Sequence, residues 1–268
     1  MAITITAPAK VNLHLRVGKK RPDGFHDIDS LFAAVDLHDR IEVEKTNGAP
    51  EIICPGVPIS ENIGWKVIDV FRSVYGVEPK VKIRIRKQIP IGRGLGGGSS
   101  DAAAILIGLS RLYDIDVEEA KGLAPLVGSD VSFFFQGGLA RVMGRGEVVK
   151  PLPFKNFHLT IISPPFPIST AWAYQQIDGR GSYSELNYDE LPSSDPKDWV
   201  NDFEPVVFDH YPILNKIKSW LMEKGALLAL LSGSGSAVFG ICDRKIPGSP
   251  PFPGFQLYTT QTIEWGVV

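Results

Sequence analysis

The sequence predicts a mixed fold of helices and strands, in which a strand, a glycine-rich loop and a helix follow one another between residues 81 and 112. Residues 81–87 alternate apolar and charged side chains, as in a strand with one buried and one exposed face. Pro90 ends the strand, and five glycines then fall within 92–98. From Ser99 the residues become small and apolar at helical spacing, with Ser99 or Ser100 as the expected N-cap. At 268 residues the chain can hold one large or two modest domains.

The glycine-rich loop has the properties of a phosphate site. Glycine lets the backbone come close to a ligand, and the helix that follows directs the positive end of its dipole at the loop. A loose surface linker is disfavoured, because a strand and a helix directly flank the loop. Asp101, expected in the first helical turn, would repel phosphate, so we expect a bound cation there or a side chain turned outward.

Three known phosphate loops fit the sequence poorly. The Walker A loop ends in Gly-Lys-Ser/Thr, which this chain lacks. The dinucleotide fingerprint occurs at Gly92, Gly94 and Gly97, but it requires a strand buried on both faces before it. The protein-kinase loop returns as a strand, whereas a helix follows here. What remains is a Pro-x-x-x-Gly-Leu-Gly-Gly-Gly-Ser-Ser loop at 90–100.

Composition narrows the class of protein. A net charge of −2 disfavours nucleic acid or an acidic membrane as the main partner. The two cysteines, Cys54 and Cys242, form neither a disulfide framework nor a metal motif, which favours a reducing, cytoplasmic location. We expect no targeting peptide, and no apolar run reaches the roughly 18 residues that span a membrane.

The first strand is expected at residues 3–17, with a kink at Pro8. Alternation then puts Val11, Leu13, Leu15 and Val17 on one face and places Lys10 and Asn12 on the other. From spacing alone Lys10 is a surface lysine, although a bulge beside Pro8 could direct it at a site.

A turn at 21–24 precedes Phe25 and His26. Spacing makes Phe25 either a core anchor or a stacking platform, and makes His26 a surface histidine. One or two strands follow over 31–44. Residues 60–62 open a helix that ends at Gly76 and buries Ile63, Val67, Val70, Phe71 and Val74.

Helix and strand patterns continue to the end of the chain. Asp116 begins a helix that ends near Gly128. Asp130 is either the N-cap of the apolar segment at 133–135 or a partly desolvated carboxylate at a site. The remaining expectations are a hairpin over 139–149, a strand at 157–162, a helix capped by Ser169 and Thr170, a surface excursion at 179–198, a helix over 212–224, strands at 227–231 and 237–240, and a loop at 247–251. The Gly-Ser loop at 232–236 is either a plain turn or a second backbone cradle.

Residues 7–13, 90–100, 128–130 and 232–236, in this order, resemble the three motifs and the catalytic aspartate of the GHMP small-molecule kinases. The resemblance implies an α+β fold of two domains, one like domain 2 of ribosomal protein S5 (1–152) and one like an α/β plait (153–268), with the active site in the cleft between them. The triple glycine and Arg-Pro-Asp-Gly-Phe-His-Asp at 21–27 narrow the resemblance to kinases that phosphorylate the 2-hydroxyl of a cytidyl-diphosphate-linked methylerythritol, on the non-mevalonate route to isoprenoids. A mevalonate or homoserine type of kinase and a non-catalytic ligand sensor on the same fold are the alternatives.

The same resemblance implies roles for single residues. Asp130 would take or orient the hydroxyl proton, and Lys10 would stabilise charge on the transferring group. Residues implied in ATP binding are Asn62, Lys87, Pro90, Ile91, Gly92, Arg93, Gly94, Leu95, Gly96, Gly97, Gly98, Ser99 and Ser100. Those implied in substrate binding are Asn12, Phe25, His26, Thr170, Tyr174, Gly233, Ser234 and Gly235, with His26 reading the cytosine edge and Phe25 and Tyr174 sandwiching its ring. ATP and Mg²⁺ are the implied cofactors, with Ser100 the one candidate metal ligand, and a monomer or weak homodimer is expected.

Three departures from the family pattern are visible. Position 25 is Phe where Tyr is usual, which keeps stacking and loses a hydroxyl contact. The usual Gly-Ala-Asp-Val-Pro reads Gly-Ser-Asp-Val-Ser at 128–132, which could change how Asp130 is held. Residues 243–256 are short and proline-rich where a helix is normal.

Overall fold

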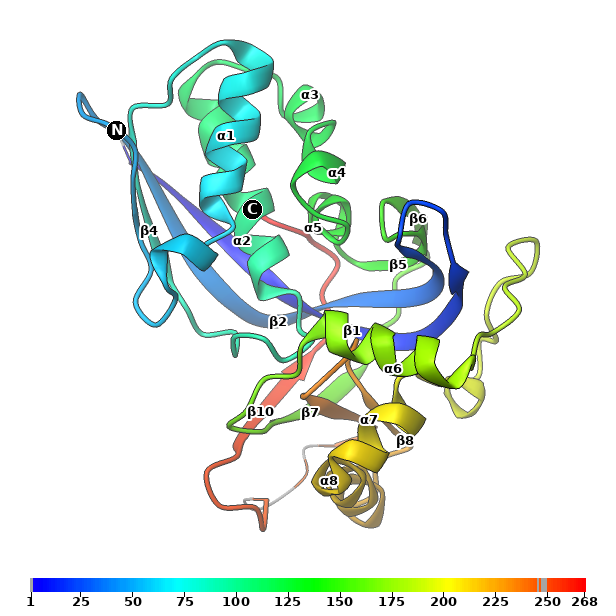
Figure 1. Ribbon diagram of the computed structural model, residues 1–268. Helices are drawn as coiled ribbons and strands as arrows, with labels where there is room; N and C mark the ends of the chain where they lie inside the picture. The colour runs from blue at the N-terminus through cyan, green and yellow to red at the C-terminus, as the bar shows by residue number, and fades with distance from the viewer. Residues whose placement is uncertain (1, 245, 247–249) are drawn as a thin grey trace.

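The computed structural model describes residues 2–244, 246 and 250–268, and it confirms an α+β fold (Figure 1). Two sheets form its framework, and most of their strand pairs are antiparallel. The first sheet contains β1 (Ala2–Lys20), β2 (His26–Lys45), β3 (Glu51–Ile53), β4 (Val81–Arg86), β5 (Leu139–Gly144) and β6 (Val148–Leu152). The second contains β7 (His158–Ser163), β8 (Leu228–Leu231), β9 (Val238–Cys242) and β10 (Gln256–Gln261). The predicted domain boundary at 152/153 falls in the connection between β6 and β7, and it stays a prediction.

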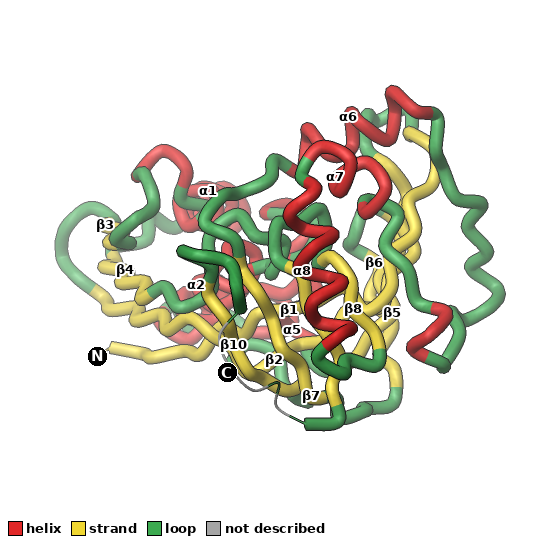
Figure 2. The backbone as a smooth tube through the Cα atoms, turned by 90° about the horizontal axis from the view of Figure 1, so that it is seen from below, coloured by secondary structure: helices red, strands yellow, loops and turns green. Residues whose placement is uncertain are grey.

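Helices cover the sheets in two groups (Figure 1). The first sheet carries α1 (Gly64–Tyr75), α2 (Gly97–Leu112), α3 (Val117–Lys121), α4 (Ala124–Val127) and α5 (Val131–Gln136). The second half contributes α6 (Thr170–Arg180), α7 (Glu204–His210) and α8 (Pro212–Glu223). Short 3₁₀ helices span Ile59–Glu61 and Pro196–Asp198. Figure 2, seen from below, shows α8 in front of the second sheet, where it contacts β8 and β9.

The first sheet has the order β3-β4-β2-β5-β6, and β1 pairs with β2 along nearly its whole length. The kink predicted at Pro8 is confirmed as a register shift between Pro8 and Ala9. A second shift lies between Asn12 and His14, so Leu13 has no partner on β2. Such bulges bend a strand and re-aim its side chains.

The prediction that four apolar residues of β1 share one face is therefore wrong. Val11 and Leu13 pack with second-sheet residues such as Phe239, whereas Leu15 and Val17 belong to the core beneath the helices. The bulge at Leu13 separates the two pairs. Strand β1 thus contributes to both cores, and Lys10 and Asn12 lie between its first two register shifts, in the stretch whose apolar residues pack with the second sheet.

Helix α2 is buried along almost its entire length, which explains its small residues. A Cβ on Gly108 would lie 2.6 Å from a methyl carbon of Val43 on β2, so only glycine lets this helix approach the sheet so closely. The expected N-cap at Ser99 or Ser100 is wrong, because Gly96, with φ 71°, caps the helix instead. The sequence pattern predicted a cap made by a serine side chain. The chain instead enters the helix through a glycine in the left-handed conformation.

Other expectations are confirmed or corrected in detail. Gly76 ends α1 as predicted, but Val74 on the same helix is 51% exposed and does not face the core. Asp116 caps α3 through bonds from two backbone N–H groups, yet the single helix expected up to Gly128 is two short helices. The expected strand at 31–44 begins earlier, at His26.

The end of the chain returns to the first half of the molecule (Figure 1, red). The backbone N–H of Val267 donates to the carbonyl of Phe134 over 2.8 Å, and the N–H of Thr6 donates to the carbonyl of Val268 over 2.6 Å. The loop predicted at 247–251 lies outside the described residues at 247–249. The described residues of 243–256 contain no helix. Within the described chain, no helix has the length and apolarity needed to cross a membrane.

Candidate active site

The glycine-rich loop forms one wall of a cavity of about 400 Å³. Residues 90–99 all line it, and Gly92, Gly94 and Gly96 have φ angles of 68°, 76° and 71°. These left-handed conformations favour glycine and turn successive backbone groups toward one concavity. The start of α2 follows directly, so its dipole favours an anion there. Ser100 does not line the cavity: its side chain is fully buried within α2.

The Gly-Ser loop at 232–236 packs directly against the glycine-rich loop. A Cβ on Gly94 would lie 2.0 Å from the carbonyl oxygen of Ser232, and the Ser232 hydroxyl donates to the Gly94 carbonyl over 2.9 Å. Gly233 and Ser234 line the cavity, whereas Gly235 does not. Of the two interpretations left open for this loop, the second backbone cradle fits its position better than a plain turn.

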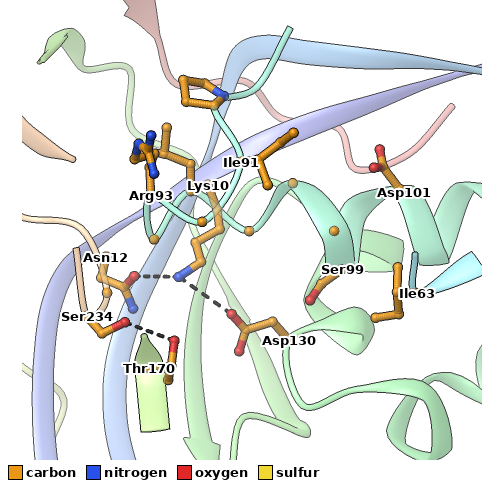
Figure 3. A pocket seen from close by; sticks show the side chains of 18 of the residues that line it. Lys10, Asn12, Ile63, Ile91, Arg93, Ser99, Asp101, Asp130, Thr170 and Ser234 are labelled. Carbon is orange, nitrogen blue, oxygen red and sulfur yellow. Dashed lines mark hydrogen bonds and ion pairs between the residues drawn. The ribbon is translucent and has the colours of Figure 1, made fainter. Parts of the chain in front are cut away.

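Lys10 and Asp130 meet in the cavity wall (Figure 3). The Lys10 Nζ lies 3.5 Å from an Oδ of Asp130 and donates to the Asn12 side-chain oxygen over 2.6 Å. Lys10 is therefore not a surface lysine; its side chain is only 5% exposed and also lies over the ring of Phe32. Burial lowers the pKa of Lys10, and the Asp130 carboxylate opposes that change.

Asp130 occupies the N-cap position of α5 without acting as a cap. Its side chain accepts no hydrogen bond from the helix N-terminus. The carboxylate is 30% exposed and faces Lys10. The capping interpretation of Asp130 is therefore not what the geometry supports, and its carboxylate is free to face a ligand.

Lys87 is held by two buried carboxylates next to the loop. Its ammonium donates to Asp39 and, over 2.7 Å, to Asp101. Burial lowers the pKa of Lys87, but the two carboxylates outweigh it and leave the pKa raised. Asp101 lies in the second turn of α2. The cation expected beside its carboxylate is supplied by the Lys87 side chain. Sequence reasoning missed Asp39, which also accepts hydrogen bonds from the backbone N–H groups of Gln88 and Ile89.

A second cavity, of about 470 Å³, adjoins the first. The two share four wall residues: Ile28, Asp130, Thr170 and Tyr174. Thr170 also connects to the Gly-Ser loop, since its hydroxyl lies 3.0 Å from the Ser234 hydroxyl. The remaining wall of the second cavity includes Phe25, His26 and four residues that sequence reasoning did not single out: Lys20, Arg145, Gln175 and Asp178.

His26 is buried, so the expectation of a surface histidine is wrong. Its Nδ1 lies 3.0 Å from the carbonyl oxygen of Gly18, and its ring stacks on Tyr174 with centroids 4.9 Å apart. That face of Tyr174 is therefore covered by His26. Phe25 is 49% exposed and has the Arg145 guanidinium over its ring at 5.0 Å, so it is a platform rather than a core anchor.

Asn62 also lines the first cavity. Its side-chain oxygen accepts from the backbone N–H of Gly64 over 2.9 Å, and its amide nitrogen is the donor end of the side chain. Ile63 and Ile91 provide apolar wall nearby (Figure 3).

Metal ligands are sparse around the site. No three of the His, Cys, Asp and Glu side chains in the described chain are grouped so as to hold a metal ion. Mg²⁺ bound with a nucleotide needs only one or two protein oxygens, because phosphates and waters supply the rest. Ser99 and Asp130 both offer oxygen atoms in the cavity wall, whereas the Ser100 hydroxyl is buried away from it. The residues present fit a nucleotide-borne Mg²⁺ and not a dedicated protein cage.

Comparison with known proteins gives a consistent result. Residues 62–138 match the family model of the GHMP kinases N terminal domain, and residues 185–247 match that of the GHMP kinases C terminal. A 4-diphosphocytidyl-2-C-methyl-D-erythritol kinase from Thermodesulfovibrio yellowstonii is 38% identical over 98% of this chain and 97% of its own length. One of the same name from Geobacter metallireducens is 39% identical over 90% of this chain and 89% of its own.

Solved structures agree with the family models. A crystal structure of 4-(cytidine 5'-diphospho)-2C-methyl-D-erythritol kinase superposes with a TM-score of 0.79 at 29% identity, covering 98% of this chain and 99% of that one. A homoserine kinase from Cytophaga hutchinsonii gives a TM-score of 0.72 at 18% identity, covering 100% of this chain and 96% of that one. The second likeness shows the fold alone.

Proposed function

The chain belongs to the GHMP kinases, in the branch formed by the 4-diphosphocytidyl-2-C-methyl-D-erythritol kinases, and we propose how its site performs that branch's reaction. The protein is an ATP-dependent small-molecule kinase. It transfers the γ-phosphoryl group of ATP to the 2-hydroxyl of the cytidyl-diphosphate-linked methylerythritol, giving the 2-phosphate and ADP. The observation that carries the site assignment is the meeting of two cavities at Asp130, beside Lys10.

The first cavity takes ATP in this proposal. Its phosphates lie against residues 92–99, where the glycine backbone and the start of α2 favour negative charge. The base lies toward Asn62 and Ile63. Lys87 acts behind the loop, because its ammonium is already bound by Asp39 and Asp101.

The second cavity takes the cytidyl substrate. Phe25 offers an exposed ring for stacking, and Arg145 adds positive charge to a wall that would face a diphosphate, whereas the Lys20 ammonium in the same wall is paired with Asp178. His26 and Tyr174 form the inner wall of this pyrimidine subsite. The substrate's reactive hydroxyl then lies at Asp130 and Thr170, where the two cavities meet.

Phosphoryl transfer depends on positioning and on charge neutralisation more than on covalent chemistry. Asp130 accepts a hydrogen bond from the 2-hydroxyl and takes its proton as the bond to phosphorus forms. Lys10, held by Asn12 and Asp130, places an ammonium where charge develops on the oxygen and the transferring group. Mg²⁺ supplies charge neutralisation on the phosphates when it is bound with ATP, and Ser99 and Asp130 are the oxygen-bearing residues that could contact it.

A direct assay tests this proposal. Purified protein is incubated with ATP, Mg²⁺ and the cytidyl substrate, and ADP release is followed; mevalonate and homoserine serve as competing acceptors. We expect ADP only with the cytidyl substrate. Turnover with mevalonate or homoserine instead, or no stabilisation by CMP in a thermal-shift measurement, would refute the substrate assignment.

The proposal also includes an expected oligomeric state and an expected location of the protein. The small-molecule substrate requires no macromolecular partner, and we expect a monomer or weak homodimer, which sedimentation can measure. We also expect a cytoplasmic location, which agrees with the unpaired state of Cys54 and Cys242.

A further inference from the structure

Asp178 binds three residues from three separate segments at the edge of the second cavity. Its carboxylate accepts from the Lys20 ammonium over 3.0 Å and from the Tyr183 hydroxyl over 3.0 Å. The Nε2 of His26 lies 3.2 Å from it. Strand β1, the start of β2 and the loop after α6 therefore meet at this one carboxylate.

The position of Asp178 on α6 explains this arrangement. Ala171, Tyr174, Gln175 and Asp178 follow helical spacing along one face, and all four line the second cavity. Tyr174 and Asp178 are one turn apart, so the His26 ring stacks on the first and faces the second. The same face of one helix thus contacts both the plane and the edge of the imidazole.

The His26 ring is fixed at its other atoms too. The Gly18 carbonyl can only accept a hydrogen bond, so the Nδ1 atom 3.0 Å away donates to it. The ring of Tyr183 lies near at 6.0 Å. Nε2 is within reach of the Asp178 carboxylate but is not aligned for a hydrogen bond, and it has no such partner in the described chain. Because Nδ1 donates, the neutral ring presents an Nε2 lone pair to this carboxylate, so the contact is attractive when Nε2 also carries a proton. In that form of His26, Asp178 is the electrostatic restraint at this end of the ring.

The contacts of Asp178 with Lys20, Tyr183 and His26 add little to the stability of the fold. The Asp178 and Lys20 side chains are 24% and 52% exposed, and exposed ion pairs contribute little to the free energy of unfolding. Desolvation raises the pKa of Asp178, but the hydrogen bonds from Lys20 and Tyr183 lower it further, so the group is ionised at neutral pH. The cluster is better suited to hold a ring in place than to hold the fold together.

Resting on the function proposed above, we propose that Asp178 is a positioning residue of the pyrimidine subsite. It holds the His26 ring against Tyr174, and the placement of that ring sets the affinity for the cytidyl end of the substrate. It touches neither ATP nor the reacting atoms, because it lines the second cavity and not the first. Its loss should therefore affect cytidyl binding and leave the chemical step unchanged.

The test measures CMP binding by titration calorimetry and steady-state kinetics for Asp178→Ala. We expect the Kd for CMP and the KM for the cytidyl substrate each to rise about tenfold, with kcat and the KM for ATP within about twofold of the unmodified protein. Asp209→Ala is the matched control: Asp209 pairs with Arg180 over 2.9 Å, is 70% exposed and lines neither cavity. We expect it to change none of these values.

Asp178→Asn is a second variant, in case the alanine variant does not fold. It keeps an oxygen for Lys20 and Tyr183 and removes the charge that faces His26, so a smaller rise in the Kd for CMP is expected. An unchanged Kd in a folded Asp178 variant would overturn the proposal, as would an equal loss of kcat and ATP affinity. If the unmodified protein does not bind CMP, both the substrate assignment and this proposal are wrong. If the unmodified protein binds CMP and the Asp178 variants bind it equally well, only this proposal is wrong.

Discussion

A Cβ atom on Gly94 would lie 2.0 Å from the carbonyl oxygen of Ser232, so the backbones of the two glycine loops are in direct contact. The backbone N–H of Ala237 also donates to the carbonyl of Arg93 over 3.1 Å. One loop follows β4 and the other joins β8 to β9. The wall of the proposed ATP cavity is therefore made by both halves of the chain.

Gly94→Ala should disturb this contact and lower kcat/KM for ATP by about 100-fold, because small misplacements of a phosphate loop have large effects on transfer. The φ of 76° adds backbone strain to the clash. Gly76→Ala is the control, since Gly76 has a φ of 65° but open space around its Cβ position. Equal kinetic effects in both variants would contradict the role of the contact.

Asp130→Ala should lower kcat on the order of a thousandfold while the Kd for ATP stays nearly constant. The comparison is Asp116→Ala. Asp116 caps α3 through the N–H groups of Glu118 and Glu119, whereas Asp130 caps nothing. We expect Asp116→Ala to lose about 1 kcal/mol of unfolding free energy and to keep its turnover. Chemical denaturation and single-turnover kinetics measure both; the reverse pattern would show that Asp130 is only a structural residue.

The alkaline limb of the kcat profile should lie below pH 10.5, because burial lowers the pKa of Lys10. Activity needs the ammonium, so it falls as pH rises through this lowered pKa. Lys10→Arg keeps its charge at high pH. Even if the variant is slow, its alkaline limb should move upward or disappear, and a limb at the same pH would assign it to another group.

The free energy of unfolding should depend on pH through the titration of Asp101. Burial raises the pKa of Asp101 to about 7, despite Lys87 beside it. A raised carboxyl pKa means that the folded state binds more protons than the unfolded state between pH 3.8 and about 7. The contribution of Asp101 is thus fully present below pH 3.8 and is lost as pH rises through 7. The melting temperature of the unmodified protein, measured relative to that of Asp101→Asn, should therefore fall as the pH rises from 3.8 to about 7. A difference between the two melting temperatures that does not change with pH would contradict this role of Asp101.

Local patterns made much of the site predictable. The alternation at 81–87, the glycines at 92–98 and the small residues after them each act over a few neighbours. They predicted the order of strand, glycine loop and helix correctly apart from the N-cap at Gly96, and phosphate binding by the loop stays a prediction. The grouping of Lys10 with Asp130 followed from the family resemblance, since spacing alone placed Lys10 on the surface.

Long-range polar contacts were not predictable in this way. Asn201 is buried and donates to the carbonyls of Leu231 and Gly233, holding the Gly-Ser loop from behind, yet its neighbours in sequence carry no motif. Asp39 and Asp178 are similar cases, because their partners lie 48 and 158 residues away in the chain. One signal was available: the spacing of Tyr174, Gln175 and Asp178 puts them on one helix face.

The returning C-terminal segment bears on how the two halves depend on each other. A Cβ on Gly266 would lie 2.2 Å from the carbonyl of Phe134, so the segment fits tightly over α5, the helix that begins just after Asp130. Severing the chain between β6 and β7 would leave the first fragment without this cover and without the backbone bonds at Thr6 and Phe134. We therefore expect that the first fragment does not fold alone, and that denaturant melts the whole protein in a single cooperative transition.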